Sequence, residues 1–130
     1  MALPECLRLL ATAAKRGAIG RLAVSQAQAP LVRPLNFVYD DHSVVVLLGQ
    51  GLALEAAKDA LVTFEVDDVD HDAGIAWSVL VRGLATTSAY DASPSGPFRY
   101  LPAPLVPEPG EMLLSIRTDV VTGRRFPLHK

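Results

Sequence analysis

The order of apolar and polar positions predicts one helix near the start of the chain. Between residues 4 and 16, apolar side chains recur at intervals of three and four, which places them on one face of a helix. Pro4 suits the first turn, where its missing N–H is not needed, and Gly17 can end the helix. The positions of this apolar stripe are Cys6, Leu9, Leu10 and Ala13.

After this helix the pattern changes to short apolar runs typical of strands. Pro34 cannot donate a hydrogen bond within a sheet, so its strand is expected at an edge or at a bulge. The second and third runs are expected to form a hairpin, and Gly83 is expected to allow a bulge in the fifth. Residues 52–59 fit one or two helical turns. The predicted strands are residues 19–26, 31–39, 44–48, 60–67, 76–90 and 112–118.

Residues 91–110 break this pattern because six of the ten prolines fall there. Strand-like sequence resumes at residue 112, so we interpret the segment as a long irregular connection inside one domain. Six strands with two short helices predict a mostly β protein, a small and mainly antiparallel barrel with helices covering its ends. Residues 1–130 are therefore expected to form a single domain.

Composition narrows the possible partners. Lys and Arg number 12 against 14 Asp and Glu, and this balance argues against a dedicated nucleic-acid binder. No apolar run approaches the roughly 18 residues of a membrane helix. Glu5 and Arg8 interrupt the stretch where a signal peptide would be apolar. Cys6 is the single cysteine, so it cannot form a disulfide within the chain. We expect a cytoplasmic protein without membrane or nucleic-acid partners.

Motifs for hydrolysis, phosphate binding or metal binding are weak. Acidic residues and His71 gather within residues 65–72, but they follow no metal-ligand spacing, and we interpret them as a solvated loop without a metal. No serine lies in a G-x-S-x-G sequence. Gly49-Gln50-Gly51 lacks the Lys and Ser or Thr of a phosphate-binding loop, and a tight turn explains both glycines.

Two residues are compatible with either packing or binding. Trp77 can pack in the core, or it can lie at a rim beside a planar ligand. Arg33 stands in an apolar strand, where a long cation needs either solvent or an anionic partner.

The ordered segments of the chain resemble the pyridoxamine 5′-phosphate oxidase-like family, in particular its small actinobacterial-type members with the FMN-binding split barrel. The resemblance covers residues 5–90 and 112–126. It implies a six-stranded antiparallel split β-barrel that forms a homodimer, with two flavin-type sites between the subunits. The segments that carry it are ECLRLL, GRLAVS, RPLNFVYDD, FEVDDVD, WSVLVRG and VTGRR.

The resemblance also assigns cofactor-binding residues. It places the flavin ring beside the strand Arg33-Pro34-Leu35-Asn36, and Asn36 offers both a donor and an acceptor to the ring. It brings Trp77 and Ser78 to the cofactor from the other subunit.

The chain departs from its relatives where they hold the FMN phosphate with Arg, Thr and Lys. The segment that matches this strand end, turn and helix start holds Leu47, Leu48, Gly51, Leu52, Ala53 and Leu54. Leucine and alanine supply no charge-assisted hydrogen bond, and each such bond contributes roughly 1.5–3 kcal/mol. Two or three missing bonds predict weaker phosphate binding by orders of magnitude.

Three functions are therefore compatible with the sequence. The first is a flavin-dependent oxidoreductase with FMN and a degenerate phosphate-binding segment, in which the cofactor carries the redox chemistry. The second is a non-redox protein that binds a small apolar ligand on the same fold and has lost FMN. The third is a deazaflavin-dependent reductase. No catalytic residue can be named for any of them.

Overall fold

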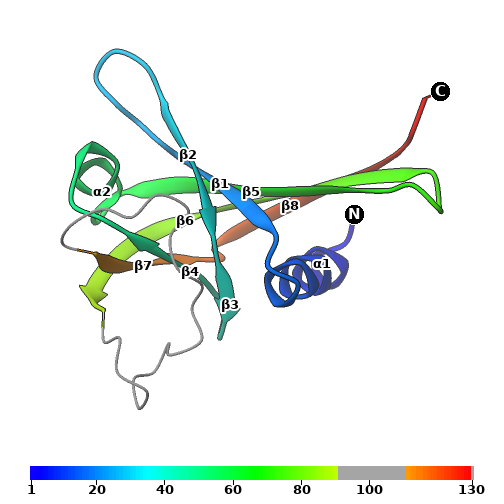
Figure 1. Ribbon diagram of the computed structural model, residues 1–130, viewed down its shortest axis with the longest axis horizontal. Coiled ribbons are helices and arrows are strands. Elements are labelled where there is room, and N and C mark those ends of the chain that lie inside the picture. The colour runs from blue at the N-terminus through cyan, green and yellow to red at the C-terminus, as the bar shows by residue number, and fades with distance from the viewer. Residues whose placement is uncertain (91–110, 130) are drawn as a thin grey trace.

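The computed structural model describes residues 1–90 and 111–129, which form two helices and eight strands (Figure 1). The proline-rich connection predicted over residues 91–110 lies outside the described residues. The elements in chain order are α1 (Leu3–Lys15), β1 (Ile19–Val24), β2 (Leu31–Asn36), β3 (Val38–Asp40), β4 (Ser43–Leu48), α2 (Leu52–Ala57), β5 (Leu61–Asp70), β6 (Ile75–Ala89), β7 (Met112–Arg117) and β8 (Val120–Pro127).

The mostly β class is confirmed, but the predicted number of six strands is wrong for the described residues. The predicted strand 31–39 is two strands, β2 and β3, interrupted at Phe37. Strand β8 was not predicted, because its sequence VVTGRRFP carries glycine, two arginines and proline instead of an apolar run. Its hydrogen bonds come from β6, which lies about forty residues earlier in the chain.

All strand pairs are antiparallel, and the order along the sheet is β2-β1-β5-β6-β7-β4-β3, with β8 also paired to β6. The predicted hairpin is formed by β3 and β4, whereas β2 pairs with β1. Strand β2 ends the order, so the prediction that Pro34 lies in an edge strand is confirmed.

Strand β6 joins the two parts of the sheet at Gly83. Before this glycine β6 pairs with β8, from Ile75 to Arg82, and after it β6 pairs with β7, from Ala85 onward. Pairing with β5 continues through Gly83 without an inserted residue, so the predicted bulge is absent on that edge. A side chain at Gly83 would overlap the Arg117 carbonyl oxygen. Glycine is needed there because another backbone approaches closely.

The sheet curls around one hydrophobic core and forms a half-barrel. Its two end strands, β2 and β3, follow each other in the chain but do not pair, which leaves the barrel split. The rings of Phe37 and Phe64 meet edge to face inside it, 5.1 Å apart. A Cβ at Gly20 would enter the Phe64 ring, so glycine lets this aromatic pair reach the barrel wall.

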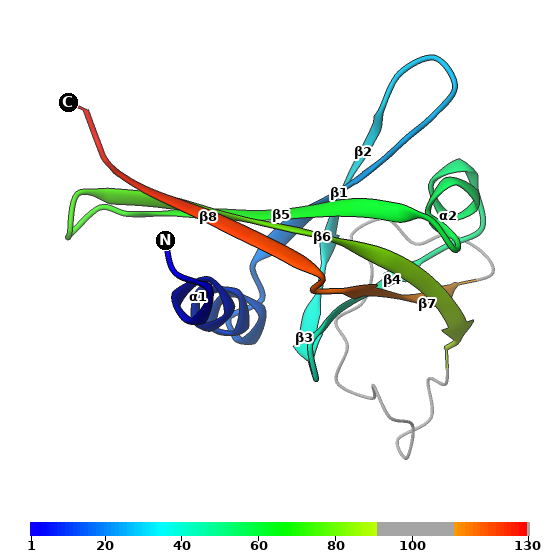
Figure 2. The ribbon, with the colours of Figure 1, turned by 180° about the vertical axis from the view of Figure 1, so that it is seen from behind.

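Helix α1 covers one side of the sheet and begins one residue before its predicted start. Cys6, Leu10 and Ala13 are fully buried, as the apolar stripe predicted. In both views the helix lies against the same side of the long arm of β5, β6 and β8 (Figures 1 and 2). Neither helix in the described part of the chain is long and apolar enough to cross a membrane.

Candidate functional site

The face of the β2-β1-β5-β6-β8 sheet that points away from the core and α1 is the candidate site, called the outer face below. Partners in an antiparallel pair point to the same face, and alternate residues of one strand share a face. Arg21 pairs with Pro34 on β2 and with Glu65 on β5, and Glu65 pairs with Leu80 on β6. One row of outer-face side chains therefore crosses four strands.

Three of the eleven sequence-predicted cofactor residues lie on this face. Asn36 stands two positions after Pro34, and Ser78 stands two positions before Leu80. The register therefore brings Pro34, Asn36 and Ser78 to one surface. Pro34 and Asn36 lie on β2 and Ser78 lies on β6, far apart in the chain. Ser78 also pairs with Arg124 on β8.

The remaining predicted residues are distributed elsewhere. Arg33 points to the opposite face of β2, level with Leu22, and it is partly buried. Gly51 and Leu52 are exposed at the start of α2. Four others belong to the main core and pack there in the single chain: Leu35, Leu48, Ala53 and Trp77.

Leu47 and Leu48 are neighbours that point to opposite sides of β4. Leu48 packs in the main core, and Leu47 forms a second cluster with Val45 and Leu113. Both leucines are at most 4% exposed. Because neither side chain reaches solvent or carries a polar atom, these two positions offer no side-chain ligand for a phosphate.

Asn36 carries the one polar side-chain atom in the described residues that is buried without a hydrogen-bond partner, its Oδ1. Such atoms are rare in folded proteins, since an unsatisfied buried acceptor costs about 1–3 kcal/mol. The whole residue is only half-buried, and its strand is at the edge of the sheet. Once the half-exposed side chain turns outward, this acceptor is a candidate partner for an N–H donor from a bound molecule.

A charged cluster of Arg21, Glu65 and Asp67 lies next to these residues. Nη1 of Arg21 donates to Oε1 of Glu65 at 3.0 Å and to Oδ2 of Asp67 at 3.1 Å. Partial burial raises the pKa of Glu65 from 4.5 to about 7, and neighbouring Asp67 adds to the rise, while Arg21 opposes it. Glu65 therefore changes its charge near neutral pH.

This cluster was missed in the sequence, where residues 65–72 were interpreted as a solvated loop. Residues 65–70 are instead the second half of strand β5. The alternation of Glu65 and Asp67 was a usable signal for two carboxylates on one strand face. Their partner Arg21 could not be identified, because it lies 44 residues away from Glu65 in the chain.

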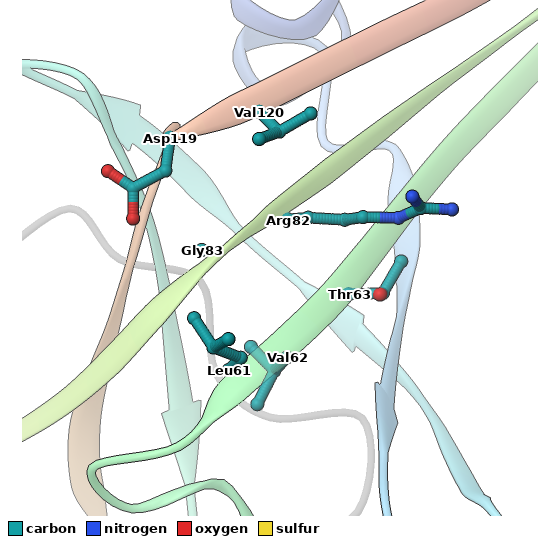
Figure 3. Close-up of a pocket in the computed structure, with 7 residues that line it drawn as sticks. All are labelled: Leu61, Val62, Thr63, Arg82, Gly83, Asp119 and Val120. Atoms are coloured by element: carbon teal, nitrogen blue, oxygen red, sulfur yellow. The ribbon is translucent and has the colours of Figure 1, made fainter.

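A shallow pocket of about 290 Å³ lies where β5, β6 and β8 meet. Figure 3 shows the Arg82 side chain extending over β5 beside Thr63, with Asp119 on the other side of the pocket. Leu61 and Val120 flank it and are 77% and 52% exposed. The pocket is therefore an apolar depression in the outer face with one cation and one carboxylate at its rim.

A second, more polar hollow of about 440 Å³ lies at the far end of the arm and includes Trp77. There Arg16 forms an ion pair with Asp68 at 2.5 Å. Within residues 1–90 and 111–129, no group of three His, Cys, Asp or Glu side chains is arranged to hold a metal ion.

Comparison with protein families gives a match over nearly the whole chain. The model of the pyridoxamine 5′-phosphate oxidase family matches residues 3–125. The chain belongs to this family. The curled antiparallel sheet with its unpaired end strands is the family's split barrel, so the resemblance stated from the sequence is confirmed.

Proteins with similar sequences or structures include two from mycobacteria. An uncharacterized protein of Mycobacterium tuberculosis is 31% identical over 128 residues, covering 94% of this chain and 81% of that protein. The structure of the FAD binding protein from Mycobacterium smegmatis is 29% identical, with a TM-score of 0.73, and the match covers 97% and 98% of the two chains.

A more distant solved structure supports the fold alone. The FAD-binding protein from Mesorhizobium loti is 19% identical with a TM-score of 0.71, and the match covers 97% of this chain and 96% of that one. Both of these solved structures are described as FAD-binding proteins.

Proposed function

We propose that this chain binds a flavin on its outer face, between two copies of itself, and that it acts as a flavin-dependent oxidoreductase. The observation that carries the proposal is the unsatisfied Oδ1 of Asn36. The flavin ring has an N–H group flanked by two carbonyls, and an amide side chain can complement such an edge with both its acceptor and its donor.

The residues fit the two parts of the cofactor differently. For the ring, Asn36 supplies the acceptor, and Pro34 and Ser78 share its face. For an FMN phosphate, the positions assigned by resemblance do not fit, because Leu47, Leu48 and Ala53 are buried and apolar. The proposal therefore rests on recognition of the ring, and FAD and FMN are both candidates, with FAD favoured by the mycobacterial relative.

When bound, a flavin supplies hydride and electron transfer, and this chain supplies position and surroundings. Asn36 would orient the ring by accepting a hydrogen bond. The apolar residues of the same face would exclude water, which strengthens that bond because the local dielectric constant falls. No acid–base residue of the chain is required for this role.

A second candidate is a non-redox protein that binds a small apolar ligand, and the burial of the leucines favours it. With the phosphate-binding side chains replaced by packed Leu47 and Leu48, the family's chemistry can be lost while the fold stays stable. The exposed apolar residues around the pocket, Leu61 and Val120, would then contact such a ligand.

Direct titration separates these candidates. The purified protein is first examined for visible absorbance, and then FMN, FAD and a deazaflavin are titrated separately while fluorescence is followed. We expect saturable binding of at least one flavin, with FAD at least as tight as FMN. A colourless protein that binds none of the three would contradict the oxidoreductase proposal and leave the apolar-ligand candidate.

A further inference from the structure

Arg82 is an exposed cation on the outer face, and its side chain has no ion pair or hydrogen bond within residues 1–90 and 111–129. Another arginine of this face, Arg21, is instead held by two carboxylates. Figure 3 shows the stem of Arg82 along the pocket and its guanidinium extended over β5 beside Thr63. The N–H donors of this guanidinium are therefore open to an acceptor from solvent or from a ligand.

Asp119, the carboxylate on the other side of the pocket, already has its own partners. Its Oδ1 lies 3.1 Å from Nε of Arg117, and its Oδ2 accepts a hydrogen bond from the backbone N–H of Leu84 at 3.3 Å. Figure 3 places Asp119 and Arg82 on opposite sides of Gly83. Asp119 therefore does not pair with Arg82, and the pocket keeps an uncompensated positive charge at its Arg82 end.

The walls of the pocket between these two ends are apolar. Thr63, Arg82 and Val120 pair across β5, β6 and β8 and share one row of the outer face, and Leu61 lies two positions before Thr63 on the same face. Leu61 and Val120 are both more exposed than buried. The pocket volume of about 290 Å³ is close to the lower end of ligand pockets, roughly 300 Å³. A small molecule that covered both side chains would remove apolar surface from water.

The pocket is separate from the amide assigned to the flavin ring. Asn36 lies on β2 and Arg82 on β6, with β1 and β5 between them. Neighbouring strands are spaced by about 4.8 Å, so the two residues are roughly 14 Å apart across the sheet. The pocket can therefore bind a ligand of its own.

We propose that this pocket binds a small organic monoanion, a carboxylate on an aromatic or branched apolar body. The planar guanidinium of Arg82 would donate two parallel hydrogen bonds to the carboxylate, and the Thr63 hydroxyl would donate a third. The apolar body would lie between Leu61 and Val120. One carboxylate matches the one unpaired cation of the pocket. The inference rests on the second candidate function, the binding of a small apolar ligand, and adds a charged end to that ligand.

Amide NMR spectra of the full chain, titrated with three probes, test the chemistry of the ligand. Cinnamate carries both parts, cinnamyl alcohol has the same body without the charge, and acetate has the charge without the body. We expect saturable binding of cinnamate with a Kd of about 1 mM or lower. The largest shifts should lie at Thr63, Arg82 and Val120. Both other probes should bind at least about tenfold more weakly, because each lacks one of the two contacts.

Two pairs of variants test the site. Arg82→Gln should raise the Kd for cinnamate roughly tenfold or more, because the charge-assisted bonds are lost. Its control is Arg124→Gln, an exposed arginine of the same face that pairs with Ser78, two rows from the pocket, and it should keep the wild-type Kd. Val120→Glu places a like charge at the wall and should abolish binding. Its control is Val32→Glu on β2, which changes a similarly exposed residue of the same row, 57% against 52%, and should bind normally.

The inference is overturned if cinnamate does not saturate, if Arg82→Gln binds it as wild type does, or if each control variant loses as much affinity as its partner. Equal affinity for cinnamate and cinnamyl alcohol would overturn the charged end alone and leave the apolar-ligand candidate in place. Flavin titration is a separate measurement, so a chain that binds cinnamate and no flavin would overturn the oxidoreductase proposal and support this inference.

Discussion

Asn36 has a buried side-chain oxygen that lacks a hydrogen bond. Its Oδ1 has no partner, whereas no other described side-chain nitrogen or oxygen is buried in this condition. The loss is roughly 1–3 kcal/mol of stability, and folded chains keep such groups where a ligand or a reaction needs them. Because β2 is an edge strand, a ligand can approach this residue from the open side of the sheet, which a neighbouring strand would otherwise occupy.

Asn36→Leu is expected to separate binding from stability. Leucine is similar in shape and removes the unsatisfied acceptor, so the melting temperature should not fall. Flavin affinity should fall roughly tenfold or more, because a hydrogen bond worth about 1–3 kcal/mol is lost. Thermal unfolding and fluorescence titration measure the two effects on the same protein.

The control for this substitution is Gln28→Leu, which makes the same amide-to-leucine change in the exposed turn between β1 and β2. It should change neither quantity. Unaltered flavin affinity in Asn36→Leu would mean that the ring is recognised elsewhere, and a large drop in melting temperature would mean that the amide stabilises the fold.

Strand β6 is the element on which the architecture depends. It is fifteen residues long and pairs with β5 along one edge and with β8 and then β7 along the other. Its neighbours change at Gly83, where the chain leaving β7 passes directly across it. Gly83 is therefore the point at which β6 passes from the long arm with β5 and β8 into the half-barrel with β7.

Gly83→Ala should destabilise the protein by at least about 1–3 kcal/mol, because the new methyl group must displace the Arg117 backbone. Urea unfolding followed by circular dichroism measures this loss. Ser88→Ala, an exposed change on the same strand, should stay within about 0.5 kcal/mol of wild type. Equal stability of the two variants would show that β7 can shift away from β6 at little cost.

For the whole molecule, the distribution of the predicted residues is informative. One chain gathers Pro34, Asn36 and Ser78 on its outer face, while Leu48, Ala53 and Trp77 pack in its own core. A single copy therefore offers one wall of a ring-binding site. A site between two copies, as we propose, would add the opposite wall.

This arrangement predicts that flavin binding and dimerisation promote each other. If each half-site is completed by the other copy, saturating FAD should lower the Kd of the dimer. Dimerisation should raise the affinity for FAD by the corresponding factor, because coupling free energies are reciprocal. Sedimentation with and without FAD measures the effect of FAD on the dimer. FAD titration of wild type and of Val120→Lys, which places a cation on the exposed outer face and is expected to prevent docking, measures the effect of the dimer on FAD binding.

A dimer Kd that does not respond to FAD would contradict the interfacial site. Equal FAD affinity of wild type and monomeric Val120→Lys would do the same, and it would assign the ring to one chain alone.

The sequence by itself determined the elements whose signals are local. The spacing of Cys6, Leu10 and Ala13 was enough for α1, and the missing N–H of Pro34 limited its strand to an edge or a bulge. The order of short segments identified the family over most of the chain. Each of these signals is contained in a few neighbouring residues, so no knowledge of distant partners was required.

The tertiary structure alone decided the features that depend on distant partners. Strand β8 exists because β6 supplies its hydrogen bonds, and Glu65 has a pKa of about 7 because the folded sheet partly buries it beside Asp67. The alternation of a strand sends Leu47 and Leu48 to opposite sides, but only packing shows that both sides are closed. Sequence spacing cannot report these contacts, because the chain makes them only after it has folded.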